Sequence, residues 1–164
     1  MHRRVQLRSR RPQQARRRRR LRAPAIALVL DTAVLVGAFD RDDEAHERCA
    51  KLLAETTRER RVVPAPVLVE VDHLLGSYTR EGSFGAVLDQ VRSGALVIED
   101  LVAQDYERMD ELLRAYGDLK VGFVDCAVLA VVERLGEPKL ATLDHRHFGV
   151  MRPRHVEALQ LLPA

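Results

Sequence analysis

Short apolar runs that fit buried strands alternate with helical segments along most of this chain. Residues 25–30 form one continuous apolar run, residues 95–98 form a shorter one, and residues 140–143 are apolar except for Thr142. Runs of this kind are typical of parallel strands that are covered on both faces. Strands that alternate with helices predict an α/β fold, in which a central, mostly parallel sheet is flanked by helices.

The remaining elements follow from spacing, charge order and breaker residues. The segment 121–135 is apolar almost all round, which predicts a buried helix. Gly76 is expected to end the helix that begins at Pro66. Other helices are expected over residues 42–60, 84–91 and 103–116, a helix start or turn over 32–39, and further strands over 62–63 and 159–162.

Charge divides the chain into two parts. The formal net charge is +3, but residues 1–22 hold eleven arginines and no acid. The rest has 16 basic and 24 acidic residues, a charge of −8. Like-charge repulsion predicts a disordered Arg-rich extension over residues 1–24 and one folded domain over 25–164. The extension is either a solvated segment without function or an electrostatic aid to RNA binding.

Nothing in the composition indicates export or membrane insertion. The apolar run after Ala23 meets Asp31 within a few residues, and no signal-peptidase site follows. No apolar run is long enough to span a membrane. Cys49 and Cys126 are far apart and have no disulfide-like spacing, so a reduced pair in a cytoplasmic protein is expected.

Four carboxylates stand where an apolar segment has no structural use for them. Asp31 and Asp144 each follow a predicted strand, and the carboxyl ends of parallel strands form the usual ligand-binding edge of such a sheet. Glu70 and Asp125 lie near the starts of two helices, where the helix dipole favours anions. Buried acids need compensation. If these four converge, a divalent cation that prefers oxygen ligands would neutralise their negative charge. Such a site indicates metal-assisted phosphoryl chemistry.

Each acid taken alone also has a purely structural interpretation. Asp31 is well placed to cap a helix that starts at Thr32, and Asp144 to cap a turn into residues 145–147. Glu70 fits an ordinary helix surface. His145 and His147 superficially suggest a metal site beside Asp144, but they lack a cysteine or a second histidine pair and are expected to be loop residues.

Other phosphate chemistries fit less well. The chain contains no G-x-x-x-x-G-K-[ST] loop and no G-x-G-x-x-G turn. A haloacid-dehalogenase-type phosphatase would have a second Asp two residues after Asp31, where Ala33 stands. A receiver domain would have a Lys after a late strand, where Leu143 and Asp144 stand.

These acids lie in segments that resemble a known family. Residues 29–33 (VLDTA), 63–70 (VPAPVLVE), 122–130 (GFVDCAVLA) and 141–148 (ATLDHRHF) are similar to the signature segments of PIN-domain ribonucleases, in particular the VapC toxins of bacterial VapBC toxin–antitoxin modules. The similarity covers about residues 25–162. Residues 1–24 have no counterpart in typical members.

The resemblance implies a three-layer PIN-like fold and an endoribonuclease that depends on Mg²⁺ or Mn²⁺. It implies that Asp31, Glu70, Asp125 and Asp144 form the catalytic metal site. Thr32 and Thr142 fit supporting hydroxyl positions, and Asp118 resembles a recurrent acid of some members, although a plain loop role suits it better.

The resemblance also implies partners: an RNA substrate, a VapB-type antitoxin that covers the acids, and a second copy of the chain. A homodimer is expected through an apolar helix face that carries Leu74, Leu75, Leu112 or Leu113. Phosphate contacts are expected from Lys120, Arg146, Arg152 and Arg154. Two alternatives stay open: a housekeeping PIN nuclease that processes ribosomal or messenger RNA, and a non-catalytic PIN-like module that binds protein.

Overall fold

The computed structural model describes residues 27–78 and 83–163. The expected Arg-rich extension over residues 1–24 lies outside the described residues. Within the described ranges, no helix is both long enough and apolar enough to cross a membrane.

Five parallel strands form the central sheet, in the order β3-β2-β1-β4-β5. β1 is fully buried, as expected for a continuous apolar run at the centre of a covered sheet. The β1–β4 register pairs Leu30 with Ala141, so the residues that follow these strands emerge side by side. The strands are β1 (Ala27–Leu30), β2 (Arg60–Pro64), β3 (Val97–Glu99), β4 (Lys139–Ala141) and β5 (Gln160–Leu162).

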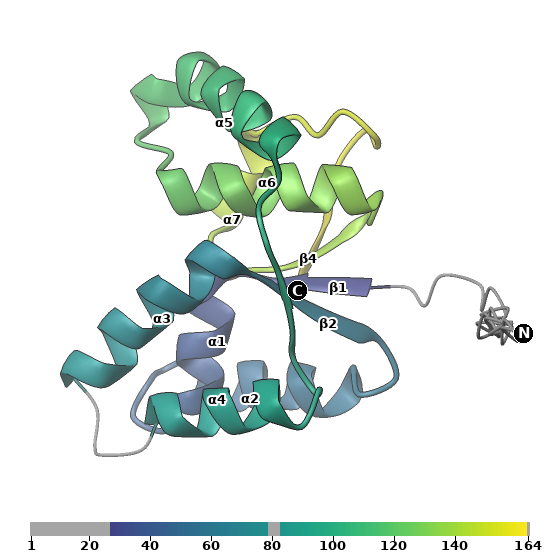
Figure 1. Cartoon of the computed structure of the whole chain (residues 1–164). Helices are drawn as coiled ribbons and strands as arrows, with labels where there is room; N and C mark the ends of the chain where they lie inside the picture. Colours follow the sequence, from purple (N-terminus) through teal and green to yellow (C-terminus); the bar gives the residue numbers. More distant parts are fainter. Residues whose placement is uncertain (1–26, 79–82, 164) are drawn as a thin grey trace, which may run out of the picture.

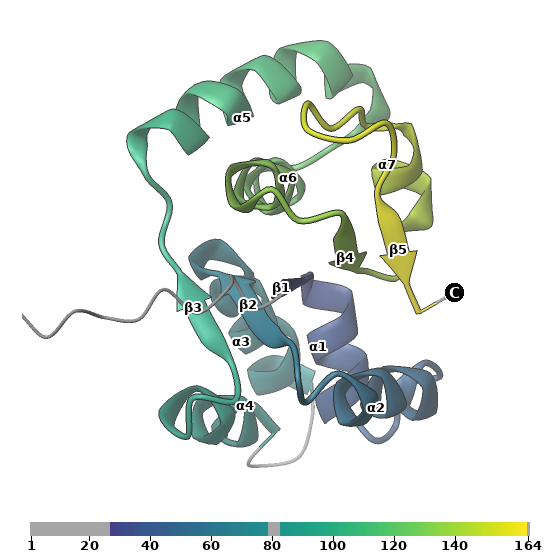
Figure 2. The same ribbon diagram turned by 90° about the vertical axis from the view of Figure 1, so that its right-hand side faces the viewer.

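Helices cover both faces of this sheet and complete three layers (Figures 1 and 2). One layer contains α1 (Thr32–Phe39), α2 (His46–Glu55), α3 (Ala65–Tyr78) and α4 (Ser83–Arg92). The other contains α5 (Ala103–Tyr116), α6 (Phe123–Leu135) and the short α7 (His145–Val150), with a 3₁₀ turn, η1 (Gly117–Leu119), between α5 and α6. The predicted α/β architecture is therefore confirmed.

The buried helix α6 carries Asp125, one of the four predicted carboxylates. Its residues from Cys126 to Val132 are all buried, in agreement with its apolar sequence. Two ion pairs tie it to α5: Arg108 Nε lies 2.8 Å from Glu133 Oε2, and Arg134 Nε lies 3.0 Å from Asp105 Oδ1. These contacts hold the C-terminal end of α6 against α5, and Asp125 lies in the first turn at the opposite end of the helix.

Three local predictions were wrong. α3 continues past Gly76 to Tyr78, because the packing of Val67, Val71 and Leu75 outweighs the cost of about 1 kcal/mol for a helical glycine. The helix expected over residues 42–60 is shorter at both ends. α2 begins at His46, because Asp43 accepts a hydrogen bond from the Ala45 N–H and forms a turn, and it ends at Glu55, so that Arg60 belongs to β2. Residues 145–147 belong to helix α7 and are not a loop.

Candidate functional site

The four predicted carboxylates line one pocket at the carboxyl end of the sheet. The pocket has a volume of about 350 Å³ and lies between β1, β4, α1, α3 and α6. Strand register, the start of α3 and the start of α6 together bring the four acids there from positions far apart in the sequence. Its lining residues are Asp31, Thr32, Ala33, Val36, Asp43, Glu70, Leu74, Asp125, Leu143 and Asp144.

Asp31 is the most deeply buried of the four acids, with 5% of its surface exposed. Its Oδ1 accepts a hydrogen bond from the Thr32 N–H at 2.7 Å, and its Oδ2 accepts one from the Thr142 hydroxyl at 2.7 Å. Burial raises the pKa of Asp31 to about 6, although these hydrogen bonds lower it. Asp31 thus both caps α1 and presents a poorly solvated carboxylate to the pocket.

Two threonine hydroxyls hold the carboxylates in position. The Thr32 hydroxyl donates to Glu70 Oε2 at 2.6 Å and so links α1 to α3. The Thr142 hydroxyl donates to Asp31 and accepts from the Asp144 N–H at 2.9 Å. The two threonines predicted at supporting positions therefore contact three of the four acids directly.

Asp125 belongs to the first turn of α6. Its Oδ2 accepts a hydrogen bond from the Gly122 N–H at 2.8 Å, which turns the carboxylate back toward the start of the helix. Burial raises the pKa of Asp125, and the negative charges of Asp144 and Glu70 raise it further. The Gly122 N–H and His147 oppose this rise.

Asp144 caps α7 and brings a further side chain to the pocket edge. Its Oδ1 accepts a hydrogen bond from the His147 N–H at 2.9 Å. The His147 ring also lies beside the acids, with Nδ1 at 2.8 Å from Asp144 Oδ2 and 4.0 Å from Asp125 Oδ2. The interpretation of His147 as a loop residue missed this contact. The capping sequence Asp144-His145-Arg146-His147 was the signal that could have revealed it, because N-cap and third helical residue meet.

Several other predicted residues lie elsewhere. Asp118 is exposed on η1 and does not line the pocket. The Arg154 guanidinium is paired with Glu111, whereas Lys120, Arg146 and Arg152 are exposed. Asp43 lines the pocket although its sequence context indicated only the start of α2.

The donor set of this pocket fits a divalent cation. Burial, and to a smaller extent repulsion between neighbouring carboxylates, raises the pKa values of Asp31 and Asp125, so keeping both ionised costs free energy. A hard cation with oxygen ligands would remove this cost. All four acids line the pocket, and among them Asp125 and Asp144 have carboxylate oxygens within 4.8 Å of each other, so these two are best placed to share an ion, with Asp31 and Glu70 in the same pocket.

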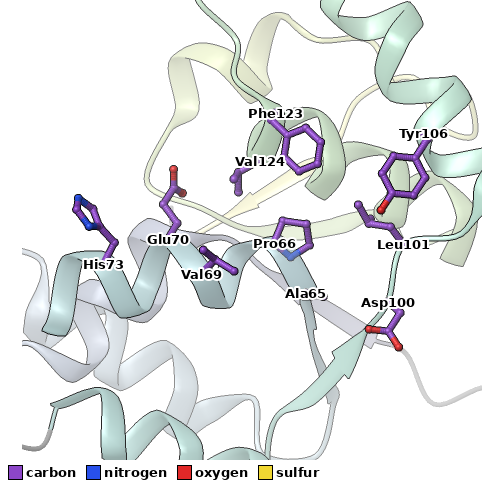
Figure 3. Close-up of a pocket in the computed structure, with 10 residues that line it drawn as sticks. All are labelled: Ala65, Pro66, Val69, Glu70, His73, Asp100, Leu101, Tyr106, Phe123 and Val124. Carbon is purple, nitrogen blue, oxygen red and sulfur yellow. The ribbon is translucent and has the colours of Figure 1, made fainter.

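A larger and more apolar groove adjoins the acid pocket and shares Glu70 with it (Figure 3). The groove has a volume of about 810 Å³. Val69 on α3, Tyr106 on α5 and Phe123 on α6 surround it, and their exposed fractions are 73%, 53% and 50%. We call this the α3–α5–α6 groove. Exposed apolar side chains grouped around one hollow are typical of a contact surface.

Comparisons with known proteins agree with this geometry. Ribonuclease VapC26 of Mycobacterium tuberculosis is 26% identical over 126 residues, which cover 77% of this chain and 93% of that protein. The crystal structure of M. tuberculosis VapC20, described as a sarcin–ricin loop cleaving toxin, superposes with a TM-score of 0.64 at 21% identity and covers 70% of this chain and 87% of VapC20. VapBC2 from Rickettsia felis, bound to a promoter DNA fragment, gives 0.60 at 19% identity and covers 84% and 99%.

The model of the family described as PIN domain matches residues 28–152 and so includes all four acids. The two solved structures share the fold of this chain. The match spans far more than half of the sequence, and the relative named above is a VapC ribonuclease. This chain therefore belongs to the PIN-domain family and is a distant homologue of the VapC ribonuclease toxins of VapBC systems.

Proposed function

We propose that this chain is a metal-dependent endoribonuclease that hydrolyses RNA phosphodiester bonds and acts as a toxin. The observation that carries the proposal is the meeting of Asp31, Glu70, Asp125 and Asp144 in one pocket. Membership of the PIN-domain family and the homology to a VapC ribonuclease support it.

The residues of the pocket would have different roles in catalysis. Bound Mg²⁺ or Mn²⁺ would supply an activated water and stabilise the charge that develops on the leaving oxygen. Thr32 and Thr142 hold the carboxylates of Glu70 and Asp31 in fixed orientations, so that little reorganisation is needed. A carboxylate of the cluster accepts the proton of the attacking water.

A cognate antitoxin would oppose this activity. A solved relative of this fold, from Rickettsia felis, was crystallised as a VapBC complex. In this chain, an antitoxin that offers a basic side chain to the acid pocket would pair with the clustered carboxylates and exclude RNA. The housekeeping alternative uses the same chemistry but needs no inhibitor, so growth on expression separates the two.

The test combines chemistry and growth. Purified protein should cleave total RNA with Mn²⁺ or Mg²⁺, cleave nothing in excess EDTA, and regain activity when metal is restored. Expression in a bacterial host should arrest growth, and co-expression of a cognate antitoxin should relieve the arrest. Undiminished cleavage in EDTA would overturn the metal mechanism. Metal-dependent cleavage with normal growth would favour the housekeeping alternative.

We also propose that a second copy of the chain occupies the α3–α5–α6 groove. The expected dimer face needs correction, because Leu75 and Leu112 are buried in the core and cannot reach a partner. Leu74 and Leu113 are only partly exposed, at 36% and 39%. The groove offers the more exposed Val69, Tyr106 and Phe123, whose burial in a dimer would contribute about 25 cal/mol per Å² of apolar surface.

Replacing Val69 by aspartate is expected to convert the dimer to a monomer without unfolding it, because a charge would then be buried at the centre of the interface. Multi-angle light scattering measures the change as a molar mass that falls by half. Leu88→Asp is the matched control, since Leu88 is 42% exposed on α4 and does not line the groove. The dimer proposal would be overturned if the wild type were already a monomer. If Val69→Asp then bound the antitoxin less tightly, the groove would be assigned to the antitoxin instead.

A further inference from the structure

Two side chains of the acid pocket and one beside it converge closely enough to bind one ion. A carboxylate oxygen of Asp125, a carboxylate oxygen of Asp144 and a ring nitrogen of His147 all lie within 4.8 Å of one another. Ligands that each lie about 2.0–2.2 Å from an ion are at most about 4.4 Å apart. Shifts of a few tenths of an ångström would therefore suffice for all three groups to bind the same cation.

The His147 nitrogen that faces the acids lacks a hydrogen bond. Nδ1 is buried and has no partner of normal hydrogen-bond geometry, although it lies 2.8 Å from Asp144 Oδ2. A buried polar atom without a partner costs free energy. The backbone N–H of His147 donates to the other oxygen of Asp144, which keeps the two residues close together. A cation between the nitrogen and the two carboxylates would supply the missing partner.

We propose that His147 is a nitrogen ligand of the catalytic metal, so that this chain prefers Mn²⁺ or Co²⁺ over Mg²⁺. Carboxylate oxygens are suitable ligands for both Mg²⁺ and Mn²⁺. An imidazole nitrogen binds transition metals well but adds little to the affinity for Mg²⁺. The inference builds on the proposed metal site and adds a residue that selects the ion. It places one nitrogen beside Asp125 and Asp144, two of the four carboxylates that the sequence predicted.

Metal binding to the full-length protein, measured without RNA, tests this inference. Isothermal titration calorimetry with Mn²⁺ and with Mg²⁺ should show tighter Mn²⁺ binding in the wild type. His147→Ala should weaken Mn²⁺ binding at least about tenfold and change Mg²⁺ binding by no more than about twofold. His145→Ala is the matched control: His145 lies on the same helix but is exposed, and this variant should bind both ions as the wild type does.

Two further measurements keep the inference falsifiable. The visible absorption spectrum of bound Co²⁺ should change in His147→Ala but not in His145→Ala, because a nitrogen ligand is lost only in the first. His147→Asn offers an amide oxygen near the position of Nδ1 and should shift the preference toward Mg²⁺, which covers the case in which the alanine variant does not fold. Circular dichroism reports the fold of each variant.

The outcomes separate this inference from the proposed function. Equal weakening of Mn²⁺ and Mg²⁺ binding in a folded His147 variant would overturn ligation and leave His147 as a side chain that orients Asp144. Unchanged binding of both ions would overturn it as well. RNA cleavage that survives with either result would leave the nuclease proposal intact. Selective Mn²⁺ binding by a protein that cleaves no RNA would support ligation by His147 and overturn the nuclease proposal.

Discussion

Replacing Asp125 by asparagine is expected to lower the rate of RNA cleavage at least about 100-fold while the protein stays folded. A metal ion contributes several kcal/mol to transition-state stabilisation. The loss of about 3 kcal/mol of this contribution corresponds to about two orders of magnitude in rate. The single-turnover cleavage rate of a defined RNA, at saturating Mn²⁺, measures the effect.

A matched surface variant tests whether the loss of any one negative charge is enough to lower the cleavage rate. Asp89 pairs with Arg92 on exposed α4, far from the pocket lining, so Asp89→Asn should cleave RNA at the wild-type rate. The thermal midpoint of Asp125→Asn should equal or exceed that of the wild type in EDTA, because one repulsive charge is removed. Cleavage by Asp125→Asn within a few-fold of the wild type would exclude Asp125 from the metal site.

The second large effect concerns stability and pH. Asp31 has a pKa of about 6 in the folded protein, against an ordinary value of 3.8, because burial disfavours its charged form. The folded state therefore binds its proton more tightly than the unfolded state does. The contribution of Asp31 to stability is fully present below about pH 4 and is lost as the pH rises through about 6. At about 1.4 kcal/mol for each pKa unit, the loss is on the order of 3 kcal/mol.

Comparison with Asp31→Asn isolates this contribution from that of other titrating groups. An asparagine can still accept from the Thr32 N–H and can pair with the Thr142 hydroxyl. In EDTA, the variant should be more stable than the wild type by up to about 3 kcal/mol at pH 7.5, and the difference should shrink toward zero near pH 4. Urea denaturation at several pH values measures it. A difference that does not vary with pH would show that Asp31 is not the titrating group.

Added metal should reverse the order of stability. A cation that binds only the folded wild type stabilises it by mass action. Millimolar Mn²⁺ at pH 7.5 should therefore raise the free energy of unfolding of the wild type and leave that of Asp31→Asn nearly unchanged. The same titration reports metal affinity independently of RNA cleavage.

The sequence by itself determined the class of fold and the identity of the acids. Continuous apolar runs can only be buried strands or helices, and their alternation with helices leaves few architectures besides a covered parallel sheet. Asp31 and Asp144 follow strands β1 and β4, so a parallel arrangement already puts both at one edge. The spacing of apolar residues also predicted α5 at its observed bounds.

Only the tertiary structure decided which side chains lie in contact and how deeply each one is buried. The link from Thr32 to Glu70 and the link from Thr142 to Asp31 join residues that are far apart in the chain, and no local pattern encodes them. His147 came to the pocket because Asp144 caps α7, whereas its sequence context indicated a loop. Leu75 and Leu112 were expected at a dimer face, but helix packing buried them. Periodicity tells which face of a helix is apolar. The neighbours that cover this face are set by long-range packing, and so are the burial and the pKa of each side chain.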